Sequence, residues 1–288
     1  MGLQIKIPNL SFTDLTLPTL YVEPMLTNGS LFLIDPTHPY NVYTGNLNNT
    51  QIMPNIAEPQ ALALVAGNTG ANIYNPNMAV PNINVERTAK GGIHAIISQT
   101  AVVSTVFDIN LPDNIRDYML TNINTHSFYT SLWHMVTRAE VASVRRNFGG
   151  YTHNDANYLW VFDAQGDLPA VASTQRIGAH QTAPGTANGP IYRSIGVNGP
   201  TNGYGTINTP DGKSIFGVGN NSGWYAGAGN TGASPSHIFY RAYIEDLTVS
   251  GRTYAQVDAI DYALYQKEIM NVGGRYYGDT FTDPVTLP

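Results

Sequence analysis

Short apolar stretches that alternate with polar residues, separated by loops rich in Gly, Pro and Asn, recur along this chain. The clearest are 127–138 (SFYTSLWHMVTR) and 157–163 (NYLWVFD). The polar residues that recur among apolar ones over 127–138 predict a half-buried β-strand, and the continuous apolar run within 157–163 predicts another strand. The chain contains 28 Gly, 18 Pro and 18 Tyr, which favour turns and pleated sheets. We therefore expect an all-β protein with long loops.

Further segments fit the same pattern. The sequence predicts strands over 29–35, 93–98, 105–110, 191–197, 204–209 and 213–218. The last two are joined by Pro210-Asp211-Gly212, in which Pro fixes φ and Gly supplies a positive φ, so we expect a hairpin turn there. One short helix is predicted over 57–66, ended by Gly67.

The C-terminal region gives the most regular pattern. Residues 237–251 (HIFYRAYIEDLTVSG) predict one long strand, with Ile238, Tyr240, Ala242 and Ile244 on one face. Thr253-Tyr254-Ala255-Gln256 follows as a capping box, which predicts a helix start. Apolar residues then recur at helical spacing over 254–270, and Gly273-Gly274 ends the helix.

This order of a long strand, a short turn and a helix carrying Ala263-Leu264-Tyr265 resembles the closing segment of concanavalin/laminin-G-like jelly rolls. Residues 214–219 (SIFGVG) match the preceding strand of that family loosely. The resemblance covers about 213–266 and extends by analogy back to about 93. It implies an antiparallel β-sandwich over 67–288 with one C-terminal helix, preceded by an extended N-terminal arm and irregular layer over 1–66.

The segment 29–35 (GSLFLID) and the Pro- and Asn-rich loops after it resemble structural proteins of tailed bacteriophages that carry such a jelly roll. The resemblance implies a non-enzymatic virion component, a capsid-surface decoration or tail-associated protein. We expect it to bind other virion subunits and to form a homo-oligomer.

Residues 1–28 are the expected assembly device, because Pro8, Pro18 and Pro24 prevent a helix and leave an extended arm. Arginine is favoured at interfaces for its planar, forked donor geometry. The candidate assembly interface comprises apolar residues of the arm and one basic pair: Ile5, Ile7, Leu10, Phe12, Leu17, Leu20, Arg145 and Arg146.

Charge and composition exclude several classes of protein. The net charge is −6 and only 12% of residues are charged, so we expect no nucleic-acid partner. No apolar run approaches the roughly 18 residues that span a bilayer, so we expect no membrane association. The absence of Cys excludes disulfides and thiolate chemistry. The first ten residues have no apolar signal region; we expect synthesis in a host cytoplasm and localisation in the virion.

Glycoside hydrolysis is the enzyme activity to test on such a scaffold. It needs two carboxylates about 5–5.5 Å or about 6.5–9.5 Å apart, which a strand supplies at positions i and i+2. Glu245 and Asp246 are adjacent and so point to opposite faces. Asp163 and Asp167 straddle a turn. No pair satisfies the template, and no Gly-x-Ser-x-Gly elbow occurs. We therefore expect no catalytic residues.

Metal and nucleotide sites have equally weak support. The seven His residues never occur at His-x-x-x-His spacing, and His134 is interpreted as a hydrogen-bonded strand residue. Asn154-Asp155, Asp163 and Asp167 could form a calcium site, but Asp and Asn also occur there as turn formers. Gly212-Lys213-Ser214 lacks the upstream Gly of a phosphate loop. We expect no cofactor and no metal.

Glycan binding is the alternative function. Trp224 and Tyr225 lie in a Gly- and Asn-rich loop (NNSGWYAGAGN), and Tyr204 lies in the same 178–232 region. Exposed aromatic rings of this kind could stack on a host surface glycan. The competing interpretation is that they fasten a long loop to the body of the protein, and solvent exposure of the rings would decide between the two.

Overall fold

The computed structural model describes residues 22–75, 83–100, 106–138, 147–154, 157–163, 189–198, 213–219 and 235–287. These ranges form two six-stranded sheets, and every strand pairing in them is antiparallel. The predicted all-β class is therefore confirmed.

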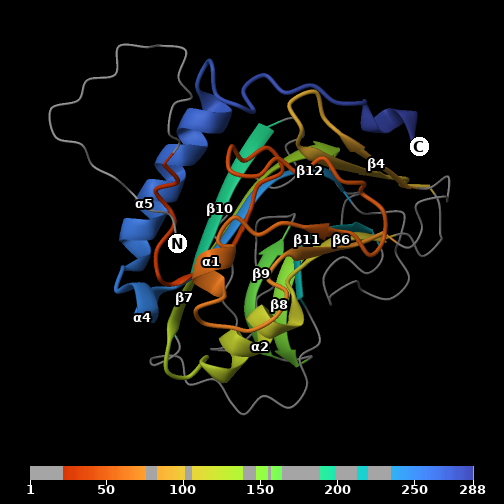
Figure 1. The fold of residues 1–288 in the computed structure, drawn as a ribbon. Coiled ribbons are helices and arrows are strands. Elements are labelled where there is room, and N and C mark those ends of the chain that lie inside the picture. The colour runs from red at the N-terminus through yellow and green to blue at the C-terminus, as the bar shows by residue number, and fades with distance from the viewer. Residues whose placement is uncertain are drawn as a thin grey trace, which may run out of the picture.

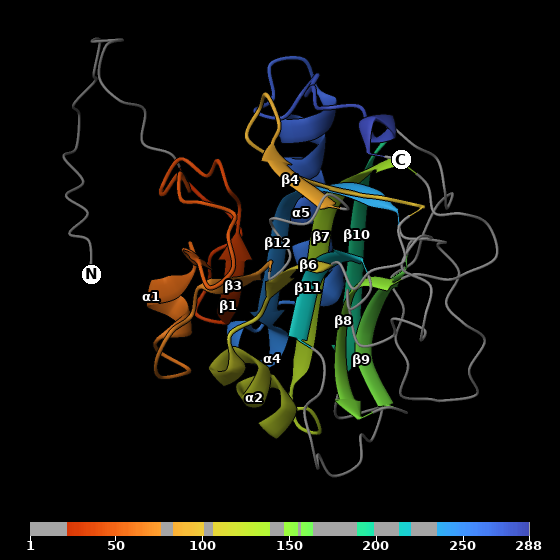
Figure 2. The same cartoon turned by 90° about the vertical axis from the view of Figure 1, so that its right-hand side faces the viewer.

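The first sheet is built around two long strands, β7 and β12. Its order is β10-β7-β12-β5-β4, and β1 also pairs with β12. β5 pairs with one half of the free edge of β12 and β1 with the other half, as the turned view in Figure 2 helps to show. The strands are β1 (Ser30–Ile34), β4 (Ile83–Arg87), β5 (Ile93–Ile97), β7 (Ser127–Arg138), β10 (Gly189–Asn198) and β12 (Ser236–Asp246).

The second sheet has the order β2-β3-β6-β11-β8-β9. Its strands are β2 (Ile52–Met53), β3 (Ala71–Tyr74), β6 (Val106–Asn110), β8 (Asn147–Asn154), β9 (Asn157–Asp163) and β11 (Lys213–Gly219). The predicted strands 29–35, 93–98, 105–110, 127–138, 157–163, 191–197 and 213–218 are thus found with ends that shift by at most two residues. The predicted strand 204–209 and the turn 210–212 lie outside the described residues.

Short helices join and cover the sheets (Figure 1). They are α1 (Glu58–Ala61), α2 (Asp113–Thr121), α4 (Leu247–Ser250) and α5 (Tyr254–Tyr265), with a π-helical turn over Gln266–Met270 and a 3-10 turn over Pro284–Thr286. In the described part of the chain, no helix is both long enough and apolar enough to span a membrane.

The main hydrophobic core lies between the two sheets. Phe128 and Leu132 of β7 pack in one cluster with Phe107 and Ile109 of β6 and with Phe216 of β11. Aliphatic and aromatic side chains at alternate strand positions supply this core, which is the usual arrangement of a β-sandwich.

A third layer covers the outer face of the first sheet. Trp133 and Tyr240 pack with Tyr265 of α5 and Ile269 of the π-helical turn. Figure 1 shows α5 running along the side of β7 and β10 that faces away from β8, β9 and β11. The long strands therefore lie between two packed layers, so β12 is buried at all eleven positions and β7 at all but its two ends.

A β-bulge breaks the alternation that the sequence predicts for β12. Phe239 pairs with His134, and Arg241 pairs with the neighbouring Trp133, so Tyr240 is an extra residue. Phe239 and Ala242 consequently face the core between the sheets, whereas Tyr240 faces α5. The prediction that Ile238, Tyr240, Ala242 and Ile244 share one face of the strand is wrong. The inserted residue reverses the face toward which each later side chain of the strand points.

Local capping explains how the C-terminal region is divided. The predicted strand to residue 251 ends at Asp246, because the Asp246 carboxylate accepts hydrogen bonds from the backbone N–H groups of Thr248 and Val249 and so starts α4. Gly251, with φ 71°, ends α4. The capping box is confirmed: Thr253 Oγ1 accepts from Gln256 N–H at 3.3 Å, and Gln256 Oε1 accepts from Thr253 N–H at 2.8 Å.

Two other expectations differ from the structure. The helix predicted over 57–66 is reduced to α1, and the residues after it form turns. Helix α2 was not expected; it begins after Pro112 and buries Ile115 and Met119, four residues apart. β1 is hydrogen-bonded to β12, so the first sheet spans the boundary expected between residues 66 and 67.

Candidate functional site

The residues that the sequence singled out lie outside the described ranges. These are the candidate glycan-stacking residues Trp224, Tyr225 and Tyr204 and the candidate assembly residues Ile5, Ile7, Leu10, Phe12, Leu17, Leu20, Arg145 and Arg146. Their roles stay predictions.

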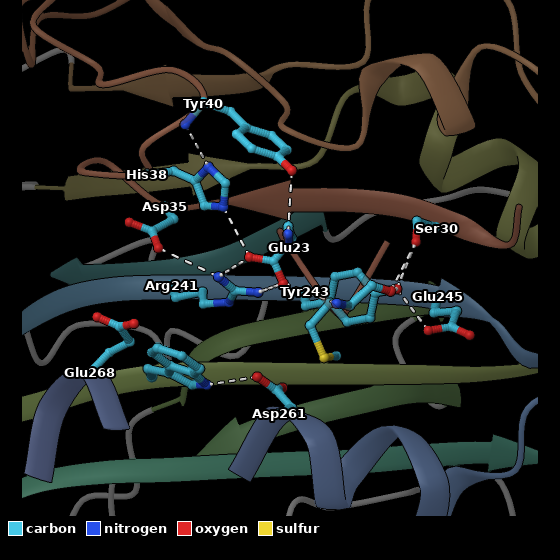
Figure 3. Close-up of polar contacts among 12 residues, drawn as sticks. Glu23, Ser30, Asp35, His38, Tyr40, Arg241, Tyr243, Glu245, Asp261 and Glu268 are labelled. Atoms are coloured by element: carbon cyan, nitrogen blue, oxygen red, sulfur yellow. Dashed lines mark hydrogen bonds and ion pairs between the residues drawn. The ribbon is translucent and has the colours of Figure 1, made fainter. Parts of the chain in front are cut away.

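The most developed polar cluster is a buried charge network that sequence reasoning missed. The guanidinium of Arg241 donates to both oxygens of the Glu23 carboxylate, at 3.1 and 3.0 Å, and both side chains are fully buried. His38 Nε2 lies 2.9 Å from Glu23 Oε2. Figure 3 shows Glu23 between Arg241, which projects from β12, and His38. The network thus fixes the start of the described chain to the middle of the first sheet.

A second branch of this network reaches the C-terminal segment. Arg275 Nη2 lies 2.8 Å from Asp35 Oδ2, and Arg275 Nε lies 3.0 Å from Glu268 Oε2. The hydroxyl of Tyr276 donates to Asp35 Oδ1 at 2.7 Å. The residue after β1 is therefore tied to the segment that follows α5.

The electrostatics of the network favour the charged forms. Burial by itself would raise the pKa of Glu23, but the charge of Arg241 and the hydrogen bonds from His38 and Arg241 hold it well below its usual value. Burial likewise opposes ionisation of Asp35, and Arg275 outweighs it and lowers the pKa of Asp35. The pKa of Arg241 is raised despite burial, because Glu23 and Asp35 favour its charge. Removing one partner would leave a buried charge uncompensated.

A ladder of hydrogen bonds connects α5 to the first sheet. Asp261 accepts from Trp133 Nε1 at 3.1 Å and from the Tyr129 hydroxyl at 3.0 Å. The Tyr129 and Tyr192 hydroxyls are 2.7 Å apart, and Tyr192 donates to Asp258 at 2.6 Å. Burial raises the pKa of Asp261 to about 6, although the charge of Arg241 partly offsets this. Asp261 is therefore a buried acid whose pKa lies well above that of an exposed aspartate.

Two histidines lie in the centre of the first sheet. His134 and His237 are buried with ring centroids 5.5 Å apart. Burial, together with the charge of Arg193, lowers the pKa of His134 well below its usual value and that of His237 to about 3. Both rings are therefore uncharged at neutral pH.

Glu245 and Asp246, the adjacent carboxylates that were compared with the glycosidase template, have partners within the protein. Glu245 is held by Arg252, with Nε to Oε1 at 2.9 Å, and by Tyr243 at 2.7 Å. Asp246 caps α4 and lies 2.5 Å from His126 Nδ1.

The residues that were considered as calcium ligands, with turn formation as the competing interpretation, have no described side chains. Asn154 and Asp163 lie on β8 and β9, whose side chains are not described, and Asp155 and Asp167 lie outside the described ranges. In the ranges that are described, no group of three or more His, Asp or Glu side chains could hold a metal ion.

Two cavities open on the described surface. One of about 430 Å³ lies beside the C-terminal segment, with Tyr240, Tyr276 and Phe281 as aromatic walls and Asp279 as an acidic group. The other, of about 520 Å³, lies where α4 and α5 begin, and is lined by Ser127, Gly196, Leu247, Thr248, Arg252, Thr253 and Tyr254. Both fall within the size range of small-molecule sites.

Two sequence signals could have pointed to the charge network and to the hydrogen-bond ladder. Arg241 interrupts the apolar run 238–244 within β12, and a buried guanidinium requires a carboxylate partner. Asp261 similarly lies on α5 four residues after the apolar Val257. Neither signal identifies the partner, because Glu23 is 218 residues away from Arg241.

Comparisons with known proteins give no family. No protein-family model matches the sequence, and no curated protein matches it. Solved structures that match include two of Trypanosoma rangeli sialidase, one in complex with 2,3-difluorosialic acid as a covalent intermediate and one with sialic acid. The TM-scores are 0.37 and 0.36, each at 11% identity, covering 81% and 84% of this chain.

The chain spans 33% and 35% of those sialidase chains, about a third of their length. Scores this low do not establish a shared fold. The likeness therefore carries no argument about fold, substrate or activity.

Proposed function

We propose that this chain is a non-enzymatic structural component of a tailed-phage virion, a capsid-surface decoration or tail-associated protein. In this proposal it assembles with other virion subunits through its N-terminal arm and displays a β-sandwich of the concanavalin/laminin-G jelly-roll type. The sequence resemblance described above motivates the virion assignment. The jelly-roll assignment is supported by β12, which leads through Leu247-Thr248 to a helix carrying Ala263-Leu264-Tyr265.

The observation that supports the assembly role is the way the N-terminal segment is attached to the first sheet. Val22 is 69% exposed, whereas Glu23 is buried against Arg241 and Met25 lies in the core beneath α5. β1 follows and is hydrogen-bonded to β12. An arm that binds a neighbouring subunit needs such a fixed attachment, because its contact with that subunit then also positions the β-sandwich.

The non-enzymatic part of the proposal is supported by how the buried acids are used. Glu23, Asp35, Glu245 and Glu268 each pair with an arginine. Carboxylates that are committed to internal ion pairs cannot reach a substrate without breaking those pairs. This statement applies to these four acids; the buried Asp261 is instead held by Trp133 and Tyr129.

The test is the mass in solution of the full chain beside a variant that lacks residues 1–21. We expect a defined oligomer for the full chain and a folded monomer for the truncated one. The cut is placed before Glu23, because a longer truncation to residue 28 would also remove the Glu23–Arg241 pair and unfold the protein for an unrelated reason. Monomers of equal thermal stability in both samples would contradict the assembly role.

Point variants sharpen this test. Phe12→Asp places a charge among the apolar residues of the arm and should shift the oligomer toward monomer. Thr13→Asp adds the same charge at the neighbouring polar position and is the matched control. Equal effects of the two variants would show that net charge, and not apolar contact by the arm, controls assembly.

A further inference from the structure

The cavity at the start of α5 has a fixed aromatic wall. Tyr254 is the first residue of α5 and is 37% exposed. Its ring lies over bare backbone of β10, because a Cβ at Gly196 would come within 2.9 Å of the ring. On another side the ring packs against Tyr129, with centroids 5.5 Å apart. Contacts from two strands therefore hold the ring in place before any ligand arrives, which lowers the entropy cost of binding.

The hydroxyl of Tyr254 is held as well. Ser194 Oγ lies 2.6 Å from this hydroxyl and 2.5 Å from Asp258 Oδ1. An ionised carboxylate only accepts hydrogen bonds, so the single hydrogen of Ser194 goes to Asp258 and Tyr254 donates to Ser194. The lone pairs of the Tyr254 oxygen remain able to accept a hydrogen bond from a ligand.

The other walls combine hydroxyl groups with a neutralised charge. Thr248 is exposed, and its Oγ1 accepts from the backbone N–H of Ser127 at 2.9 Å, which leaves its own hydrogen for donation. Arg252 lines the cavity, but its guanidinium is bound to the buried carboxylate of Glu245. The described lining contains no carboxylate.

We propose that this cavity binds an uncharged saccharide, with a sugar ring stacked on Tyr254 and sugar hydroxyls bonded to Thr248 and to the Tyr254 oxygen. A sugar presents an apolar ring face and polar edges, which match an amphipathic tyrosine wall beside hydroxyl groups. The net charge of −6 disfavours anionic ligands. The described lining has no carboxylate that could bind a cationic ligand.

The experiment is calorimetric titration of the full chain with uncharged hexasaccharides, namely maltohexaose, cellohexaose and hexa-N-acetylchitohexaose. An anionic hexagalacturonate and a cationic glucosamine hexamer are the charged comparators. We expect saturable binding of at least one uncharged probe and weaker binding of both charged probes. Tyr254→Ala should weaken binding about tenfold or more, as expected for the loss of one stacked aromatic contact. Tyr254→Phe keeps the ring but loses the hydroxyl, so it should weaken binding less than Tyr254→Ala does.

Two further variants make the test specific to the cavity. Tyr74→Ala removes a tyrosine of similar exposure, 41%, from β3 and should leave binding unchanged. Thr248→Val removes the hydroxyl at nearly constant shape and should weaken binding even if Tyr254→Ala fails to fold. Thermal unfolding of each variant establishes that it is folded.

Three results would overturn the proposal. They are the absence of binding of every uncharged probe at millimolar concentration, a preference for a charged probe, and affinity that is unaffected by Tyr254→Ala and Thr248→Val. The saccharide site goes beyond the proposed virion role. The two proposals can fail separately, because the arm truncation is tested by the mass in solution and the cavity is tested by ligand affinity.

Discussion

Asp261→Asn should stabilise the protein at neutral and alkaline pH. The pKa of Asp261 is raised from 3.8 to about 6 by burial. A difference of about 2 pKa units corresponds to about 3 kcal/mol, at 1.36 kcal/mol per unit. Because the folded-state pKa lies above the unfolded value, the folded state binds the proton more tightly between about pH 4 and 6. Stability from this group is therefore present at low pH and is lost as pH rises through about 6.

Asparagine removes this cost while keeping the hydrogen-bond geometry. Its oxygen can accept from Trp133 Nε1, and its amide can donate to the Tyr129 hydroxyl, which then donates onward to Tyr192. Arg241 keeps Glu23 as its partner, so no buried cation is left uncompensated. The variant should gain up to about 3 kcal/mol over the wild type at pH 8 and little at pH 4.

The assay is urea unfolding of both proteins at several pH values from 4 to 8. The difference between the two unfolding free energies is the quantity of interest, because every other titration cancels in it. Asp117→Asn on α2, whose side chain is 56% exposed, is the control. A difference that stays constant from pH 4 to 8, or that favours the wild type more at pH 8, would refute the reasoning.

Three further predictions follow from the packing of the N-terminal segment. Arg241→Met should lower the unfolding free energy by about 3–5 kcal/mol, since Glu23 would remain buried without its cation; urea unfolding at pH 7 measures this. Gly29→Ala should destabilise the protein by about 1–3 kcal/mol, seen as a lower Tm, because a Cβ there would lie 2.3 Å from the backbone oxygen of Asp246. Acid titration followed by circular dichroism should show stability falling below about pH 4, where the lowered pKa values of Glu23 and Asp35 make protonation costly; an unfolding free energy that stays constant from pH 5 to 3 would contradict this assignment.

The elements that the sequence predicted well are those governed by local rules. Strand β7 was found with both its ends because residues 127–138 mix aromatic and aliphatic residues with small polar ones and contain no Gly or Pro. The start of α5 was found because Thr253 and Gln256 satisfy each other's backbone groups within four residues. Such signals do not depend on which part of the chain packs alongside.

The elements that sequence reasoning missed depend on distant parts of the chain. The bulge at Tyr240 is visible only in the pairing with β7. Burial of both faces of β12 requires that α5 cover the outer face, which alternation within the strand cannot reveal. Glu23 was treated as part of an extended arm because its partner Arg241 is 218 residues away. The saccharide cavity joins Gly196, Thr248 and Tyr254 from three elements, so no single motif marks it.

The pairing of β1 with β12 has a consequence for how the protein is made. The ribosome releases Glu23 long before Arg241, and at about 5–20 residues per second the interval of 218 residues corresponds to about 10–40 s. Throughout that time Leu31, Phe32 and Leu33 of β1 lack the strand that later pairs beside them. The first sheet can close only after β12 has been synthesised, so the nascent chain carries an unpaired apolar strand throughout that interval.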